Sequence, residues 1–83
     1  MSMAARTAFC RAGLHARPAA VFVRAVLDSL APVRIGRPGG ESADARSIVS
    51  VLALDIQPGE PVVLSAEDER LLDQLAALLE AGR

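Results

Sequence analysis

Two stretches with the periodicity of an amphipathic helix most constrain how this chain can fold. The first starts at Ala16 and cannot continue past Pro32; its apolar residues at helical spacing are Ala19, Phe22, Val23, Val26, Leu27 and Leu30. The second closes the chain before Gly82, and its apolar stripe consists of Leu71, Leu72, Leu75, Leu78 and Leu79. Residues 65–68 resemble a capping box at the start of this second helix. Each predicted helix has one apolar face, which has to pack against the rest of the chain.

The residues outside these helices predict short strands separated by turns. The first strand follows the polar start of the chain and ends before Gly13. A Pro-Gly-Gly turn at residues 38–40 joins the next two strands into a hairpin, and the turn at residues 57–59 precedes a valine-rich last strand. The predicted strands cover residues 4–10, 32–37, 41–45 and 61–65.

The segment at residues 47–54 is ambiguous from its pattern alone. Ser47 precedes a short apolar run whose start is rich in β-branched residues, which suits a buried strand as well as a short helix. With this segment left open, the order of elements predicts an α+β sandwich in which the helices cover one face of an antiparallel sheet. The chain has 83 residues, so we expect residues 1–83 to form a single domain.

The composition excludes several classes of function. The chain is 52% hydrophobic and 23% charged with a net charge of -1, which is typical of a soluble globular protein and not of a nucleic-acid binder. No apolar run approaches a membrane span, so we expect no membrane insertion. Cys10 is the only cysteine, which excludes an intramolecular disulfide and the usual thiolate metal sites. We therefore expect a cytoplasmic protein without a metal or another cofactor.

His15 is the strongest candidate for a functional residue. It lies between a glycine-containing loop and the helix that begins at Ala16, which is the N-cap position. Unpaired backbone N–H groups and the positive end of the helix dipole favour an anion at this position. Arg17 adds a guanidinium that matches phosphate oxygens, and Pro18 costs no helical hydrogen bond in the first turn. Which ring nitrogen of His15 reacts depends on what hydrogen-bonds the other nitrogen.

The string Gly-Leu-His-Ala-Arg-Pro-Ala at residues 13–19 resembles the active-site signature of the HPr family, the histidine-containing phosphocarriers of the bacterial phosphoenolpyruvate-dependent sugar phosphotransferase system. The string Arg-Ser-Ile at residues 46–48 resembles the regulatory-serine segment of that family. The resemblance covers nearly the whole chain. It implies an open-faced β-sandwich with the order βαββαβα, a four-stranded antiparallel sheet in the order 1-4-2-3 and three helices on one face, which makes residues 47–54 the second helix.

The resemblance also implies a function and its partners. His15 would accept a phosphoryl group from enzyme I and donate it to the A domain of sugar-specific permeases, and Arg17 would stabilise the phosphate. Such a protein is a carrier with a covalent phosphohistidine and not a free-standing enzyme, and this role favours a monomer. Partners would dock on a shallow apolar surface around the histidine, matched here by Ala20, Arg24, Ile48, Val49 and Leu52. Arg24 lies seven residues from Arg17 and therefore on nearly the same helix face.

Ser47 has two interpretations. Serine is a common N-cap, so its role can be purely structural. The resemblance instead implies phosphorylation by HPr kinase, whose product would repel acidic partners and could engage a transcription regulator. Ser50 is a competing hydroxyl.

Other functions stay open. The chain could be a carrier of the nitrogen-related phosphotransferase system or of the dihydroxyacetone kinase relay, or a regulatory binding module controlled by Ser47. A small hydrolase or ligand-binding domain ranks last, because so short a chain can hardly enclose a concave pocket.

Overall fold

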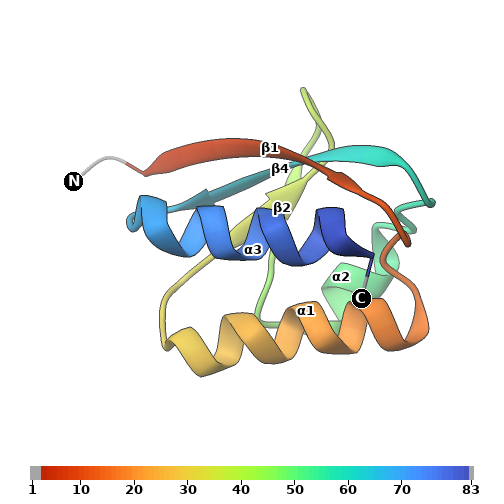
Figure 1. The fold of residues 1–83 in the computed structure, drawn as a ribbon, viewed down its shortest axis with the longest axis horizontal. Helices are drawn as coiled ribbons and strands as arrows, with labels where there is room; N and C mark the ends of the chain where they lie inside the picture. The colour runs from red at the N-terminus through yellow and green to blue at the C-terminus, as the bar shows by residue number, and fades with distance from the viewer. Residues whose placement is uncertain (1–2, 83) are drawn as a thin grey trace.

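The computed structural model describes residues 3–82, which form four strands and three helices. The elements are β1 (Ala4–Cys10), α1 (Ala16–Ser29), β2 (Arg34–Gly36), β3 (Ser42–Asp44), α2 (Ile48–Ala53), β4 (Glu60–Ala66) and α3 (Glu69–Ala81). The strands form one antiparallel sheet in the order β1-β4-β2-β3. Figure 1 shows the sheet above the helices, which all lie on the same side of it. This arrangement confirms the predicted fold class.

The core lies between the sheet and the helices. Alternate residues of the paired strands β1 and β4 point toward the helices and are buried, among them Ala8, Val62 and Leu64. The helices contribute buried side chains from their apolar stripes, including Phe22, Val26, Val51, Leu72 and Leu75. The opposite face of the sheet is open, and Phe9 on it is 56% exposed. The sandwich therefore has one covered face and one solvent face.

The segment that was ambiguous in the sequence is helical. It forms α2, and the Ser47 hydroxyl accepts a hydrogen bond from the backbone N–H of Ser50 at 3.2 Å. This is a side-chain N-cap, and Val51 is the residue that the helix buries. The tertiary contact made by Val51 outweighs the strand propensity of the β-branched residues at the start of the helix.

One prediction about the helix ends is wrong. The predicted capping box at residues 65–68 does not form, because β4 extends to Ala66 through its pairing with β1 and includes Ser65. The N-cap of α3 is Asp68, whose carboxylate accepts a hydrogen bond from the backbone N–H of Arg70 at 2.9 Å. The first helix ends at Ser29, ahead of Pro32, because Leu30 adopts a left-handed conformation with φ 59°. The end of α3 at Gly82, with φ 75°, is as predicted.

Strand β1 has the predicted bounds, and the boundaries of the other three strands shift by one or two residues. The hairpin strands β2 and β3 are shorter than expected, and β4 is longer by one residue at each end. None of the helices over residues 3–82 is long and apolar enough to cross a membrane.

Candidate functional site

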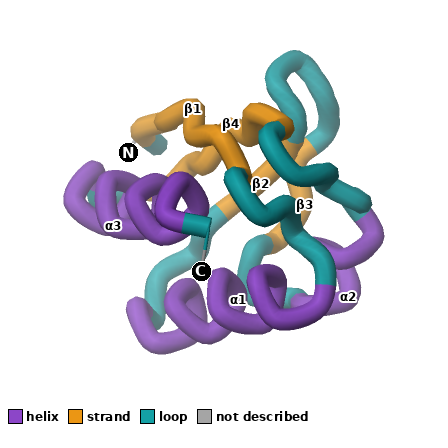
Figure 2. Tube along the Cα trace, turned by 45° about the vertical axis from the view of Figure 1, so that its right-hand side comes forward, coloured by secondary structure: helices purple, strands orange, loops and turns teal. Residues whose placement is uncertain are grey.

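The loop that carries His15 is anchored to the segment that leaves α2. The buried Leu14 donates its backbone N–H to the Ile56 carbonyl at 2.9 Å. Gly13 has φ 73°, and a Cβ at this position would lie 2.8 Å from the same carbonyl oxygen. Only glycine satisfies both the left-handed backbone and this close approach. Figure 2 shows the result, in which the loop entering α1 and the loop leaving α2 lie together at one end of the molecule.

His15 occupies the N-cap position of α1, as predicted. Its backbone is extended, with φ −122° and ψ 154°, and its side chain forms no capping hydrogen bond. Ala16 follows with φ 47°, a left-handed conformation that costs an alanine about 1 kcal/mol. The N–H groups of Ala16 and Arg17 belong to the first turn and have no intrahelical acceptor, so they are available to an anion at this end of the helix.

The His15 ring is held by a carboxylate that the sequence analysis did not single out. Nε2 of His15 lies 2.5 Å from Oδ1 of Asp55, and the two side chains are 42% and 72% exposed. The same carboxylate oxygen accepts a hydrogen bond from Nε2 of Gln57 at 3.0 Å. An ionised carboxylate can only accept, so in the neutral imidazole Nε2 of His15 carries the proton and Nδ1 has the lone pair.

The segment that presents Asp55 is itself clamped by Arg37. The guanidinium donates to the carbonyls of Leu54 at 2.8 Å and Asp55 at 3.1 Å, which are carbonyls at the C-terminal end of α2. It also forms a two-pronged ion pair with Glu60 at 2.8 and 3.0 Å. Glu60 in turn accepts the backbone N–H of Gln57 at 2.7 Å. These hydrogen bonds hold the pKa of Glu60 at about 2, well below its ordinary value of 4.5.

Asp55 has the left-handed conformation that this tight clamp requires. Its φ is 52°, a value that aspartate adopts more readily than most residues other than glycine and asparagine. The sequence signal for it was an acidic residue two positions ahead of the turn at residues 57–59. Nothing in the local pattern connects a residue to a partner 40 positions earlier, so sequence reasoning missed the pair.

Arg17 is exposed in the first turn of α1 and enters none of the ion pairs among residues 3–82. Its guanidinium is therefore not neutralised by a neighbouring carboxylate. Arg24, two turns further along, is also exposed but pairs with Asp28 at 3.3 Å. An exposed pair of this kind contributes little to stability, about 0.3–0.5 kcal/mol, so Arg24 can exchange its partner at small cost.

The structure brings four of the five residues expected on the partner surface to the surfaces of α1 and α2 that adjoin each other. Ala20, Arg24 and Ile48 line a shallow depression of about 280 Å³ together with Val23 and Leu27. Leu52 lies one turn after Ile48 on α2 and is 41% exposed. The fifth residue, Val49, is the most exposed of the apolar residues of α2, at 72%. We call Ala20, Leu27, Ile48 and Leu52 the α1–α2 apolar patch.

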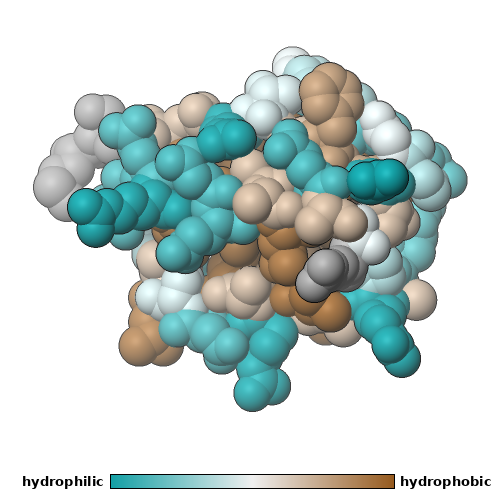
Figure 3. Space-filling view, viewed as in Figure 1, coloured by the Kyte–Doolittle hydropathy of each residue, from teal (hydrophilic) through white to brown (hydrophobic). Residues whose placement is uncertain are grey.

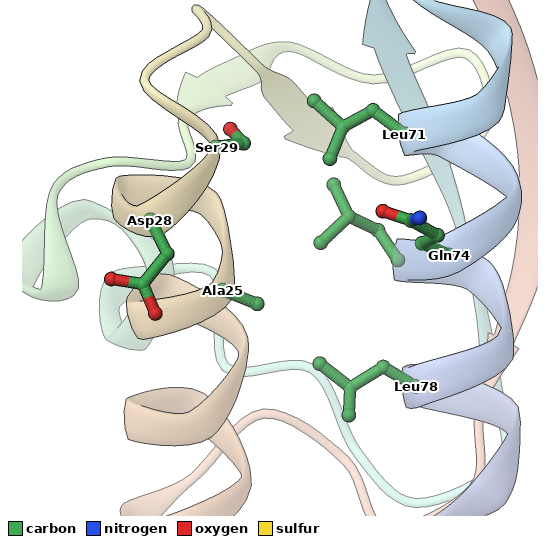
Figure 4. A pocket seen from close by; sticks show the side chains of 7 residues that line it. Ala25, Asp28, Ser29, Leu71, Gln74 and Leu78 are labelled. Carbon is green, nitrogen blue, oxygen red and sulfur yellow. The ribbon is translucent and has the colours of Figure 1, made fainter.

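A second groove lies away from His15. It has a volume of about 440 Å³ and runs between the C-terminal half of α1 and α3. Figure 4 shows Ala25 and Ser29 on one wall and Leu71, Gln74 and Leu78 on the other, and Figure 3 shows apolar surface between these two helices. Ala25 is ten residues from His15, about 15 Å along the helix. This groove is therefore not part of the histidine site.

No group of three or more His, Cys, Asp or Glu side chains within residues 3–82 is arranged to hold a metal ion. Cys10 is buried, and its burial together with the charge of Glu60 raises the pKa of the thiol to about 11. Cys10 therefore stays protonated, consistent with a small core residue at the end of β1.

The sheet order and the histidine at the start of α1 together define the HPr-like class of small α+β proteins. Comparison with known proteins agrees. Residues 7–81 match the family described as PTS HPr component phosphorylation site. The phosphocarrier protein HPr of Streptomyces coelicolor is 42% identical over 73 residues, which cover 84% of this chain and 78% of that protein. The chain thus belongs to the HPr family of phosphocarriers of the phosphotransferase system.

Two further relatives bear on the fold and on the type of carrier. The crystal structure of an HPr from Bacillus anthracis superposes with a TM-score of 0.86 at 30% identity, covering 95% of this chain and 99% of that one. The phosphocarrier protein NPr of Proteus mirabilis is 31% identical over 75 residues, which cover 87% of this chain and 83% of that protein. Both HPr and NPr proteins are therefore among its relatives.

Proposed function

We propose that this chain is a cytoplasmic, monomeric phosphocarrier that accepts a phosphoryl group on Nδ1 of His15 from enzyme I and donates it to the A domain of a sugar-specific permease. The observation that carries the proposal is the hydrogen bond from Nε2 of His15 to Asp55, which leaves the lone pair of Nδ1 available. Membership of the HPr family supports the role of a phosphocarrier. The position of His15 within the matched residues supports His15 as the residue that carries the phosphoryl group.

Residues of this chain can supply the nucleophile for phosphoryl transfer and the groups that stabilise the phosphoryl oxygens. The Nδ1 lone pair of His15 forms the new P–N bond while the bond between phosphorus and the donor nitrogen breaks, and its electron pair returns to the donor. The N–H groups at the start of α1 and the exposed guanidinium of Arg17 would stabilise the phosphoryl oxygens. The α1–α2 apolar patch would seat the partner, with Arg17 and Arg24 facing its acidic groups.

The proposal is tested by incubating the protein with enzyme I, phosphoenolpyruvate and magnesium and then measuring its intact mass. We expect one phosphate-sized mass gain that is lost in acid and absent from His15→Ala. A gain that persists in His15→Ala, or no gain on folded wild-type protein with an enzyme I from the same source, would contradict the proposal.

A carrier for another relay branch is the second candidate, and the 31% identity with the NPr of Proteus mirabilis favours weighing it. The phosphorylated protein can be offered in parallel to the A domain of a sugar permease, an A domain of the nitrogen-related system and the dihydroxyacetone kinase relay. Rapid transfer of the phosphoryl group to only one of these acceptors would assign the protein to the relay of that acceptor.

Regulation through Ser47 is a separate candidate, and its position at the start of α2 beside Ile48 favours it. A phosphate on this hydroxyl would place charge at the edge of the α1–α2 apolar patch, where it would repel acidic partners. Incubation with HPr kinase should then phosphorylate the wild type and not Ser47→Ala. Unchanged binding of every partner and regulator after phosphorylation would remove this role, and Ser50→Ala serves as the matched control.

A further inference from the structure

We infer that Asp55 is a positioning residue for His15, which holds a proton on Nε2 and thereby makes the phosphohistidine of this chain a better phosphoryl donor. The inference deepens the proposed function and rests on it, because it concerns the histidine that carries the phosphoryl group. Asp55 is not among the residues that the sequence pattern points to.

The geometry of the pair is specific. The distance between Nε2 and Oδ1 is 2.5 Å, so the ring contacts the carboxylate directly through a hydrogen bond whose acceptor is charged. Asp55 is held at two points, because Gln57 donates a hydrogen bond to its carboxylate oxygen and Arg37 donates one to its backbone carbonyl. Asp55 has a left-handed backbone, with φ 52°. A backbone conformation that costs free energy and is held by several hydrogen bonds persists where the surrounding contacts over-determine it.

The chemical consequence follows from the proton count on the ring. When the phosphoryl group is bound to Nδ1 and the proton stays on Nε2, the ring is an imidazolium next to a carboxylate. Transfer to an acceptor then breaks the P–Nδ1 bond, and the electron pair returns to Nδ1. The ring leaves as a neutral imidazole that still has its Nε2 proton. Without that proton the leaving group would be an imidazolate, which is a much poorer leaving group.

The effect has a limited size, because both side chains are partly exposed to water. We expect removal of the carboxylate to slow loss of the phosphoryl group by about fivefold, the range of one exposed charge-assisted hydrogen bond. A purely structural role for Asp55 predicts the opposite sign, because a loosened site would expose the phosphohistidine to water and accelerate its hydrolysis.

The test uses Asp55→Gly and Asp55→Asn, since glycine and asparagine both adopt a φ of 52° and neither has a carboxylate. Asp73→Asn is the matched control, because Asp73 is an exposed carboxylate on α3 that pairs with Arg6. All proteins are phosphorylated chemically with phosphoramidate, and the rate of phosphate loss is followed at neutral pH. We expect slower loss in both Asp55 variants and the wild-type rate in Asp73→Asn. Equal or faster loss in the Asp55 variants would overturn the inference.

A second readout does not depend on phosphorylation. His15 is the only histidine of the chain, so the ¹⁵N spectrum of histidine-labelled protein reports this ring alone. In the neutral ring we expect Nε2 to have the resonance position of a protonated nitrogen and Nδ1 that of an unprotonated one. In Asp55→Gly the two resonances should move toward each other as the second tautomer gains population. A wild-type ring with its proton on Nδ1 would overturn the inference.

These experiments separate the inference from the proposed function. Chemical phosphorylation and the ¹⁵N spectrum need no enzyme I, so they test Asp55 even if enzyme I does not recognise the chain. Conversely, a wild-type protein that enzyme I phosphorylates and an Asp55→Gly variant that loses phosphate at the wild-type rate would leave the carrier role intact and remove Asp55 from it.

Discussion

At the scale of single residues, the site is defined by what each side chain is bonded to. His15 has one nitrogen bonded to Asp55 and one that keeps its lone pair. Arg17 is exposed and unpaired in the described chain, whereas Arg37 donates hydrogen bonds to Glu60 and to two backbone carbonyls. Two arginines of the same chemistry therefore have different roles, one available for an anion and one structural.

The role of Arg17 predicts a defect in transfer without a loss of stability. Arg17→Ala should lower the rate at which enzyme I phosphorylates His15 by about tenfold, because a charge-assisted contact to the phosphoryl oxygens is lost. Arg17→Lys should recover only part of the rate, since it keeps the charge but not the planar fork. The measurement is the initial rate of phosphorylation, with the exposed Arg70→Ala as control. Equal rates in Arg17→Ala and Arg70→Ala would contradict this assignment.

The ion pair of Glu60 predicts how stability depends on pH. The pKa of Glu60 is lowered from 4.5 to about 2, so its contribution is complete above pH 4.5 and is lost as the pH falls toward 2. Glu60→Gln should remove this part of the pH dependence and be less stable than the wild type at pH 7. Thermal unfolding midpoints between pH 2 and pH 7 measure both effects. Glu80→Gln on the exposed face of α3 is the control, and an identical slope in all three proteins would rule out the expected linkage.

At the scale of elements, the site is assembled from two segments that are far apart in sequence. The start of α1 supplies His15 and Arg17, and the segment after α2 supplies Asp55. The contact between the backbone N–H of Leu14 and the Ile56 carbonyl sets their spacing. The start of α1 was predictable, because caps and helical periodicity are local signals. The pattern of residues 47–54 suited a strand as well as a helix, and only the resemblance to the HPr family implied α2. The contact between the two segments was not predictable, because it depends on a backbone hydrogen bond between residues that are far apart in the sequence.

Gly13 at this join should be sensitive to substitution. Gly13→Ala adds a Cβ 2.8 Å from the Ile56 carbonyl oxygen at a residue with φ 73°, so we expect a loss of about 2 kcal/mol or more in the free energy of unfolding. Gly39→Ala separates the two causes, because Gly39 has φ 74° but no atom within 4 Å of the added Cβ. It should lose only the backbone contribution, about 1 kcal/mol. Urea unfolding measures both, and equal losses would show that the steric contact is unimportant.

At the scale of the whole molecule, the chain covers one face of a four-stranded sheet with three helices and places its chemistry at one end of that layer. The two long helices and the sheet order were predicted from periodicity and from the resemblance carried by residues 13–19. The predicted capping box was wrong because Ser65 belongs to β4, which pairs with β1 as far as Ala66. The role of Asp55 and its hydrogen bonds to Arg37 and Gln57 were not predicted, because the tertiary fold and not a local sequence pattern brings these residues together. The fold was thus more predictable than the hydrogen bonds that tune the site.

The measurement that tests the central claim most directly is a chase of the isolated, phosphorylated protein. The protein is phosphorylated by enzyme I, purified, and mixed with the A domain of a permease, and the phosphoryl group is followed on both proteins by intact mass. Our account predicts that His15 loses its phosphoryl group as the A domain gains one, with no transfer from a protein in which His15 is replaced by alanine. Release of inorganic phosphate without gain on any A domain would contradict the carrier role.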